Sequence, residues 1–306
     1  MIFRDKLEFW GNLLHSEFAR LLEMAFSNQY DNGDLLLFHV NGFYEESLVD
    51  VTTIDGGKYN PHVIGPGVLG FSEQTHFDFI DQYRQSDSSA SLFSEYIEQI
   101  KYDPEKQNEI DELVYFESTT IQIEMLIYIK IWEADLTIKK LYEFVRILNG
   151  EPYDWNFKVA ESSRDKGCTA TRQDLIRQLI RDKVKAFSPL LYDWIKDAYK
   201  TQIRNSIAHS NYSIMGRNIS LNNFIANDPA SQLGNIEFDQ WIDIFHKTLI
   251  LHNELTWLSN EVNEIYGRNA LAKHPIYIAV TEITGEKYMF SVEYREEFKD
   301  WNYKND

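Results

Sequence analysis

The apolar stretch Ile121–Trp132, with the sequence IQIEMLIYIKIW, decides the fold class of this chain. Its only charged residues are Glu124 and Lys130, so apolar side chains surround most of any helix formed here. Apolar residues continue on both sides, from Ile110 to Leu148. A segment of this length and pattern predicts a central, heavily packed helix with a kink or a break.

Cap residues bound this central segment, and helical spacing recurs elsewhere. Asp103-Pro104 is typical of a helix start, and Asn149-Gly150 is typical of a helix end. Apolar residues spaced three and four apart predict further amphipathic helices. These cover Glu8–Phe26, Ala90–Ile100, Thr171–Phe187, a segment from Ser188-Pro189 to Ile207, and Phe238–Tyr266.

Strand patterns lie towards both ends of the chain. The runs Leu35–Val40 and Leu48–Ile54 predict two strands, and alternation over Ile276–Val280 and Met289–Tyr294 predicts a β-hairpin. Because an isolated hairpin is marginally stable, we expect the N-terminal strands to pair with it. Turns or loops are predicted at Gly56-Gly57, Pro61, Gly65-Pro66-Gly67, Gln85–Ser89, Met215–Asn235 and Thr284-Gly285.

The predicted fold is mainly α, with a bundle of four to five long helices from about Tyr102 to Arg268. We expect three segments along the chain. Residues 1–101 form a mixed α/β region, which is the natural place for sensing or regulation. Residues 102–270 form the helical domain, and residues 271–306 form the hairpin and a tail that packs with the N-terminal region.

Composition places the chain among folded proteins and narrows the kinds of site. The 306 residues are 43% hydrophobic and 25% charged, which is ordinary for a folded protein. A single cysteine, Cys168, leaves no disulfide framework and no cysteine-based zinc site. The charged N-terminus is unlike a signal peptide, and Ile121–Trp132 is too short to cross a bilayer. We therefore expect a cytoplasmic protein without a membrane partner.

The charge is unevenly distributed along the chain. The net charge is −18, yet the stretch Arg164–Arg217 holds eleven Lys/Arg and five Asp/Glu, a local net charge of +6. The rest of the chain therefore carries −24. Such a basic stretch is either the footprint of a nucleic acid or a solvated helix face. Within or beside it, we expect Lys200, Arg181, Lys185 and Tyr212 to bind RNA.

The sequence Arg204-Asn205-Ser206-Ile207-Ala208-His209 lies inside this basic stretch and has the richest chemistry. Arginine pairs bidentately with phosphate oxygens, and histidine exchanges protons near neutral pH. Arg268-Asn269 followed by His274 has the same pattern at the end of a predicted helix. Basic residues there also suit a helix C-terminus, so we assign the site to the first sequence and keep the second as its rival.

The first sequence resembles the signature of the HEPN superfamily, in which an arginine, a polar residue and then a histidine occur late in a helix of an all-α bundle. The resemblance implies an HEPN-like bundle and a metal-independent endoribonuclease without a cofactor. It implies catalytic roles for Arg204, Asn205 and His209. The RNA 2′-OH attacks the adjacent phosphorus, leaving a 2′,3′-cyclic phosphate and a 5′-OH. The alternative is a noncatalytic HEPN-like module that binds RNA or a partner.

The helical geometry adds an expectation about assembly. Five residues at about 100° each separate Arg204 and His209 by roughly 140° around a helix. Two copies across a twofold axis can bring the arginine of one to the histidine of the other, so we expect a homodimer with a composite site. The resemblance further implies an antiphage-defence or toxin effector that an inhibitory or activating partner or ligand controls.

The other histidines give no metal-binding pattern. His246 and His252 are six residues apart on a predicted helix, whereas helical metal pairs are spaced by three or four. We interpret them as packed residues. His39, His62 and His76 lie in the N-terminal region with no recurring ligand spacing, so we expect no metal.

Overall fold

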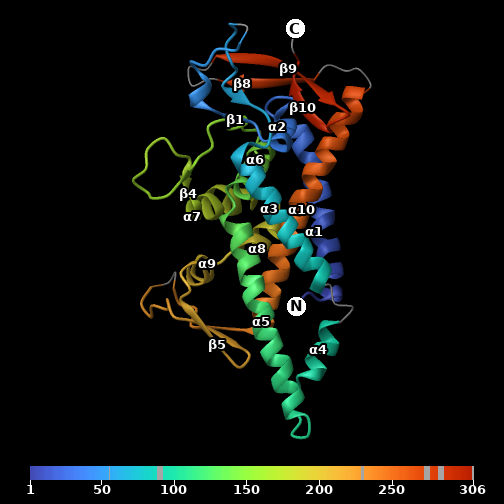
Figure 1. Ribbon diagram of the computed structural model, residues 1–306, viewed down its shortest axis with the longest axis vertical. Helices are drawn as coiled ribbons and strands as arrows, with labels where there is room; N and C mark the ends of the chain where they lie inside the picture. The colour runs from blue at the N-terminus through green and yellow to red at the C-terminus, as the bar shows by residue number, and fades with distance from the viewer. Residues whose placement is uncertain (55, 88–91, 229–230, 272–275, 282–285, 305–306) are drawn as a thin grey trace. The chain divides into compact units, whose positions relative to one another are not determined.

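The computed structural model describes residues 1–54, 56–87, 92–228, 231–271, 276–281 and 286–304, and its described part is mainly helical (Figure 1). The chain folds into two compact units, each assembled from three stretches. Unit 1 comprises Met1–Glu17, Glu73–Ala134 and Ser188–Glu254, and unit 2 comprises Phe18–Ser72, Asp135–Phe187 and Leu255–Asp306. Among the described helices, none is long and apolar enough to cross a membrane.

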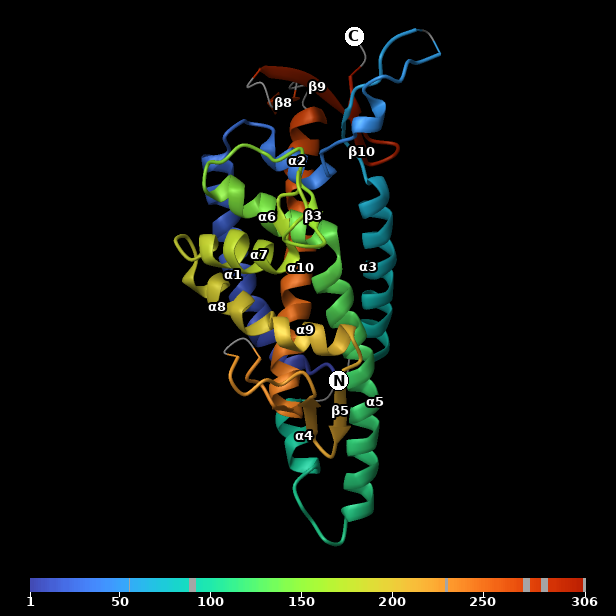
Figure 2. The ribbon, with the colours of Figure 1, turned by 90° about the vertical axis from the view of Figure 1, so that its left-hand side faces the viewer.

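Unit 1 contains α4 (Phe93–Gln99), α5 (Gln107–Glu133), α8 (Pro189–Ala198) and α9 (Thr201–Ala208). It also contains the first part of α1 (Arg4–Asn28), most of α3 (Gly67–Asp87) and the first half of α10 (Phe238–Leu271). An antiparallel sheet follows α9, with strand order β5 (Tyr212–Met215), β6 (Asn218–Leu221) and β7 (Asn235–Glu237). Both ribbon views show α9 beside the C-terminal half of α5 (Figures 1 and 2).

The core of unit 1 forms around the apolar stretch of α5. Tyr128 and Trp132 are fully buried there, and Trp241 packs on Tyr128 from α10 with ring centroids 5.6 Å apart. Glu124, which interrupts the apolar run, is also buried. Its carboxylate accepts hydrogen bonds from Trp241 Nε1 (2.8 Å) and from Tyr83 Oη (3.0 Å), which offset the cost of its burial.

Unit 2 is built around α6 (Asp135–Leu148), a helix that is buried on almost every side. Against it pack α2 (Asp34–Val40) and the π-helical segment η2 (Leu175–Asp182), which follows the short helix α7 (Arg172–Asp174). The unit also holds η1 (Glu46–Leu48) and two small sheets. These pair β1 (Phe43–Tyr44) with β2 (His62–Val63), and β3 (Val159–Ala160) with β4 (Ala170–Thr171).

The C-terminal hairpin is confirmed, and a third strand extends it. The sheet has the order β10 (Asp300–Tyr303), β9 (Lys287–Arg295) and β8 (Ile276–Thr281), all antiparallel. Gly33, just before α2, lies so close to β8 that an added Cβ would be 2.5 Å from Tyr277 O. Only glycine permits this approach. The predicted turn at Thr284-Gly285 lies outside the described residues.

The predicted strands in the N-terminal region are wrong. Leu35–Val40 is the helix α2, in which Leu35, Leu36, Leu37 and Phe38 are all buried. A short run that is apolar on every side fits a buried helix as well as a strand, so periodicity cannot separate the two. Leu48–Ile54 forms the end of η1 and a turn, with one isolated bridge between Thr52 and Lys58. The predicted pairing of these runs with the hairpin is therefore also wrong.

Three more segments differ in secondary structure from the prediction. The segment from Ser188 to Ile207 is two helices, because Tyr199 is extended (φ −99°, ψ 114°) between α8 and α9. Met215–Asn235, predicted as a loop, contains β6 and the ends of β5 and β7. The helix α3 was missed, and it extends through the first part of the predicted loop Gln85–Ser89. The rest of that loop lies outside the described residues.

The central segment has the break that its sequence predicts. The helices α5 and α6 are separated at Ala134, which is extended (φ −70°, ψ 113°). The predicted stop is confirmed at Gly150, which has a φ of 66°. The helix α5 begins at Gln107, three residues after Pro104, while Asp103 caps a turn by accepting a hydrogen bond from the Glu105 N–H.

Candidate functional site

The helix α9 carries the candidate site, and its sequence explains its limits. Lys200 precedes it in an extended conformation, and the Lys200 N–H donates to Tyr128 Oη of α5 (3.2 Å). Ile203 and Ser206 face the interior of unit 1 and are buried. Arg204 and Asn205 therefore lie on the part of the helix that is only half-buried.

Arg204 is held in place by two neighbouring side chains. Its Nε forms an ion pair with Glu133, the last residue of α5, and its NH1 donates to Asn205 Oδ1 (2.8 Å). The hydrogen bond and the charge of Glu133 raise the pKa of Arg204 above its ordinary value. Of the five guanidinium N–H groups, the remaining three have no acceptor among the described residues. Arg204 is thus an oriented cation with donors left for an anion.

His209 is the C-cap residue of α9 and is exposed. Its backbone N–H still bonds to Asn205 O (3.1 Å), so the helical path extends to this residue. The roughly 140° separation from Arg204 therefore holds approximately in the folded chain. No hydrogen bond to the imidazole is formed within the described part of the chain, which leaves the ring accessible from solvent.

The turn after His209 is firmly held. Ser210 adopts a left-handed conformation (φ 51°). This turn brings the backbone of Asn211 within hydrogen-bonding distance of α9. The Asn211 N–H donates to Ser206 O (2.7 Å), and Ser206 Oγ donates to Asn211 O (2.5 Å). These bonds fix the backbone on both sides of His209.

Asn205 lies one helical turn before His209, and its backbone carbonyl accepts the His209 N–H. Its side-chain oxygen accepts a hydrogen bond from Arg204. Its role in this geometry is to fix the guanidinium together with Glu133.

The four residues expected to bind RNA lie in different units. Lys200 and Tyr212 belong to unit 1, where Tyr212 starts β5 opposite Leu221 and is half-buried. Arg181 and Lys185 belong to unit 2, where Arg181 pairs with Asp182 (2.7 Å). Lys200 and Tyr212 thus belong to the same unit as Arg204.

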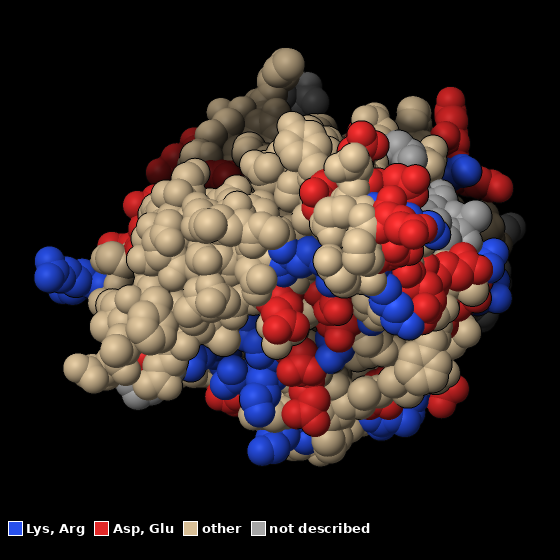
Figure 3. All heavy atoms as spheres, turned by 90° about the horizontal axis from the view of Figure 1, so that it is seen from below, with Lys and Arg blue, Asp and Glu red and all other residues tan. Residues whose placement is uncertain are grey.

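The net positive charge of Arg164–Arg217 is partly neutralised in the folded protein by acidic residues from other parts of the chain. Several basic side chains of Arg164–Arg217 form ion pairs with acids that lie outside this stretch. The pairs are Arg172–Asp135, Lys183–Glu151, Arg204–Glu133, Arg217–Glu117 and Arg217–Asp239. On the face shown in Figure 3, acidic and basic side chains are interspersed, and a broad area beside them is uncharged.

The rival sequence pattern is only partly described. Arg268 lies in the last turns of α10, and its Nε donates to Glu264 O (3.3 Å) within the same helix. Its side chain thus interacts with the C-terminal part of its own helix, as basic residues there commonly do. His274 lies outside the described residues.

Three other histidines pack against neighbouring groups. His246 is buried in unit 1 between the Phe3 N–H and Ile242 O. His39, in unit 2, is hydrogen-bonded to Ser259 Oγ (3.0 Å), and His62 lies against the Trp155 ring. Across the described residues, no group of three or more His, Cys, Asp or Glu side chains is placed to hold a metal ion.

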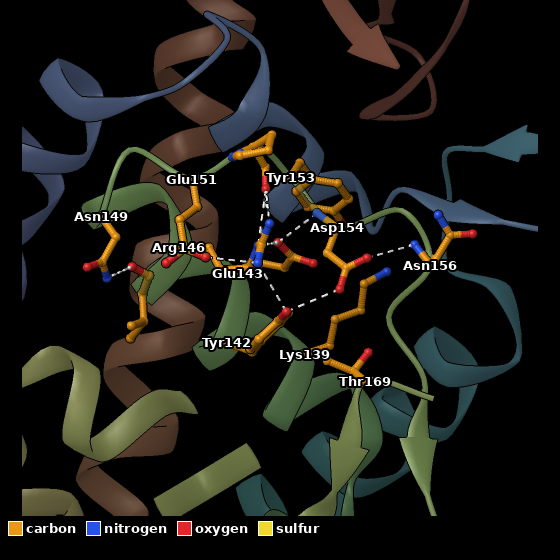
Figure 4. A network of polar contacts seen from close by, with 12 residues as sticks. Lys139, Tyr142, Glu143, Arg146, Asn149, Glu151, Tyr153, Asp154, Asn156 and Thr169 are labelled. Atoms are coloured by element: carbon orange, nitrogen blue, oxygen red, sulfur yellow. Dashed lines mark hydrogen bonds and ion pairs between the residues drawn. The ribbon is translucent and has the colours of Figure 1, made fainter. Parts of the chain in front are cut away.

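Two features of the structure were missed in the sequence. Glu133 was not singled out, because the sequence does not show at which residue the central helical segment breaks. The second is a network of polar contacts on α6. Its four α6 residues, which are spaced by three and four positions in the sequence, are Lys139, Tyr142, Glu143 and Arg146. Tyr142, Glu143 and Arg146 point from α6 towards the loop that carries Tyr153 and Asp154 (Figure 4).

Comparison with known proteins gives no relative for this chain. No protein-family model matches it, and neither the curated proteins nor the solved structures contain a significant match.

Proposed function

We propose that this chain is a metal-independent endoribonuclease of the HEPN type, with Arg204 and His209 as its catalytic residues. The observation that carries the proposal is the arrangement at the end of α9. An arginine oriented by Glu133 and Asn205 precedes an exposed histidine whose backbone is fixed on both sides. This combination provides a phosphate ligand and a proton-transfer group on one helix end.

The reaction that fits these groups is transesterification within RNA. The 2′-oxygen attacks the adjacent phosphorus as His209 removes its proton, and the bond from phosphorus to the 5′-oxygen breaks. The departing 5′-oxygen takes up a proton, so the products are a 2′,3′-cyclic phosphate and a 5′-OH. Arg204 stabilises the charge that grows on the nonbridging oxygens. DNA lacks the attacking hydroxyl and is not cleaved.

The geometry also favours a shared site. Arg204 and His209 project about 140° apart around α9, so one copy does not easily direct both at the same phosphate. We propose a homodimer in which Arg204 of one copy acts with His209 of the other. A toxin or antiphage-defence role, with a controlling partner or ligand, belongs to the same proposal.

One observation favours the second candidate, a noncatalytic module that binds RNA or a partner protein. Glu133 compensates the charge of Arg204, and this weakens its attraction for a phosphate. In that role the exposed His209 and the three remaining donors of Arg204 form a recognition surface without chemistry.

The test is RNA cleavage in the presence of EDTA. Wild-type protein, Arg204→Ala and His209→Ala are incubated with end-labelled RNA, and the product ends are identified. We expect EDTA-resistant cleavage to 2′,3′-cyclic phosphate in the wild type and at least a hundredfold loss in both variants. An RNA with 2′-deoxy sugars throughout should remain intact.

Arg268→Ala and His274→Ala are the matched controls, since they change the same residue types in the rival pattern. Circular dichroism shows whether each variant is folded, and His209→Ala is informative in any case because the residue is exposed. Equal background cleavage by all proteins contradicts the proposal. Loss in His274→Ala, with activity kept in His209→Ala, assigns the activity to the rival pattern.

A further inference from the structure

A cavity of about 1160 Å³ that is partly open to solvent lies within unit 2. Its wall is formed by β1, β2, the start of α3 and the loop after Tyr153, and α6 contributes Lys139. Pockets for small ligands usually measure about 300–1,000 Å³ and are largely apolar. The cavity therefore has room for a small molecule and for water around it.

Aromatic side chains make up much of the wall. Trp155 is buried, and its Nε1 donates to Ala279 O (3.2 Å), which fixes the plane of the indole. The ring of His62 lies edge-on to it, with centroids 5.1 Å apart, and Tyr44 packs on His62. Phe43 and Phe157 are half-buried and also line the cavity. Rigid aromatic faces of this kind favour a flat aromatic ligand.

Lys139 places a positive charge in this apolar wall. It is only 3% exposed, and its Nζ donates to Asn41 Oδ1 (3.0 Å) and to Gly42 O (2.5 Å). An ammonium group has three N–H donors, and the third has no acceptor among the described residues. Burying a cation costs free energy unless an anion compensates it, and the charges of Glu143 and Asp154 do not fully compensate the burial of Lys139.

The carboxyl group nearest along the helix compensates this charge only in part. Glu143 is one turn after Lys139 on α6, but it does not line the cavity. Burial and the charge of Asp154 raise the pKa of Glu143 well above its ordinary value, which favours its neutral form. Burial lowers the pKa of Lys139 to about 8, and the charges of Glu143 and Asp154 oppose this shift.

The cavity rim limits how much negative charge a ligand can carry. Glu45 and Glu46 line the cavity and are more exposed than Lys139, with Glu45 Oε1 accepting from Ser47 Oγ (2.7 Å). Lys158, also exposed, offsets only part of this charge. Polyphosphates are therefore disfavoured, and a ligand with one anionic group fits the charges best.

We propose that this cavity binds a small aromatic molecule with a single carboxylate, whose ring packs on Trp155 and whose carboxylate pairs with Lys139. The inference is independent of the proposed ribonuclease activity, since it concerns residues of unit 2 only.

The test is isothermal titration calorimetry with 2-naphthoate as the probe. Its neutral counterpart, 2-naphthalenemethanol, has nearly the same shape, and decanoate carries the same charge on an aliphatic chain. A charge-assisted hydrogen bond contributes about 1.5–3 kcal/mol, which corresponds to a factor of roughly 10–100 in affinity. We expect 2-naphthoate to bind the wild-type protein at least tenfold more tightly than either comparator.

Two lysine variants locate the charge. Lys139→Met should weaken binding of 2-naphthoate by roughly 10–100-fold while leaving 2-naphthalenemethanol unaffected. Lys140→Met is the matched control, because Lys140 is the next residue on α6 and does not line the cavity. If Lys139→Met does not fold, the comparison of the three probes on the wild-type protein decides alone. No detectable binding, equal binding of the neutral probe, or tighter binding of decanoate overturns the proposal.

Discussion

At the scale of single residues, the hydrogen bonds of the buried His246 fix the protonation state of its ring. His246 accepts a hydrogen bond from the Phe3 N–H at Nε2 (2.9 Å), and its Nδ1 faces Ile242 O (2.7 Å). Only the neutral ring with its proton on Nδ1 satisfies both partners. Protonation would place a second N–H against the Phe3 donor in a site that is closed to water.

Acid should therefore destabilise the protein through His246. Burial lowers its pKa from 6.5 to about 3, so the unfolded state binds more protons between these values. The stabilisation is fully present above pH 6.5 and is lost as the pH falls towards 3, at up to about 1.4 kcal/mol per pH unit. Urea unfolding at pH 7.5, 6.0 and 5.0 measures this slope.

His246→Gln should flatten the slope, because glutamine does not titrate. His209→Gln is the control, since His209 is exposed and its replacement should leave the slope unchanged. An NMR titration in which His246 ionises near pH 6.5 in the folded protein would contradict this account.

The sequence predicts part of the candidate site. Arg204 and His209 are recognisable by their spacing on a helix, whereas Glu133 is not, because 71 residues separate it from Arg204. Lys139 and the cavity could not be predicted either. A lysine among the other polar residues of a helix looks like a surface residue until its partners Asn41 and Gly42 are brought to it by folding.

At the level of elements, helix ends decide where the chain changes direction. Ser188 caps α8, with its Oγ accepting from the Leu191 N–H (3.0 Å), and Pro189 fills the first helical position. Because Ser188 is fully buried, no water can replace this hydrogen bond. The cap therefore sets the start of α8.

Ser188→Ala should destabilise the protein by about 1 kcal/mol, since the Leu191 N–H loses its only side-chain partner. The measurement is the midpoint and slope of urea unfolding. Ser188→Thr keeps the hydroxyl and is expected to retain most of the stability. A loss in Ser188→Thr as large as in Ser188→Ala would mean that packing, and not the cap, holds this turn.

Long amphipathic elements were predictable, and short buried ones were not. The helices α1, α5, α6 and α10 and the C-terminal hairpin follow from apolar periodicity over ten or more residues or from clean alternation. The seven-residue helix α2 has no polar face to reveal its period. The break at Tyr199 carries no glycine or proline signal, so α8 and α9 appeared as one helix.

On the scale of the whole molecule, the proposed dimer makes a quantitative prediction. Arg204→Ala and His209→Ala are each inactive, but a mixed dimer of the two contains one composite site with both residues intact. If the copies exchange freely, half of the dimers are mixed, and about one quarter of the wild-type activity returns. Mixing the purified variants after unfolding and refolding them together measures this recovery.

The control mixture pairs Arg204→Ala with the double variant Arg204→Ala/His209→Ala. This mixture contains no intact composite site and should stay inactive. If the first mixture also stays inactive while an affinity tag on one variant co-purifies the other, each copy must use its own Arg204 and His209.

The arrangement of each unit from three separate stretches has a consequence for how the protein folds during synthesis. Unit 1 needs a contact between Phe3 and His246, and unit 2 needs one between His62 and Tyr303. Contacts between residues this distant in sequence form slowly, because long loops must close first. Neither unit can finish folding until most of the chain has emerged from the ribosome. The early helices therefore expose their apolar faces for much of translation and depend on protection from aggregation until the end.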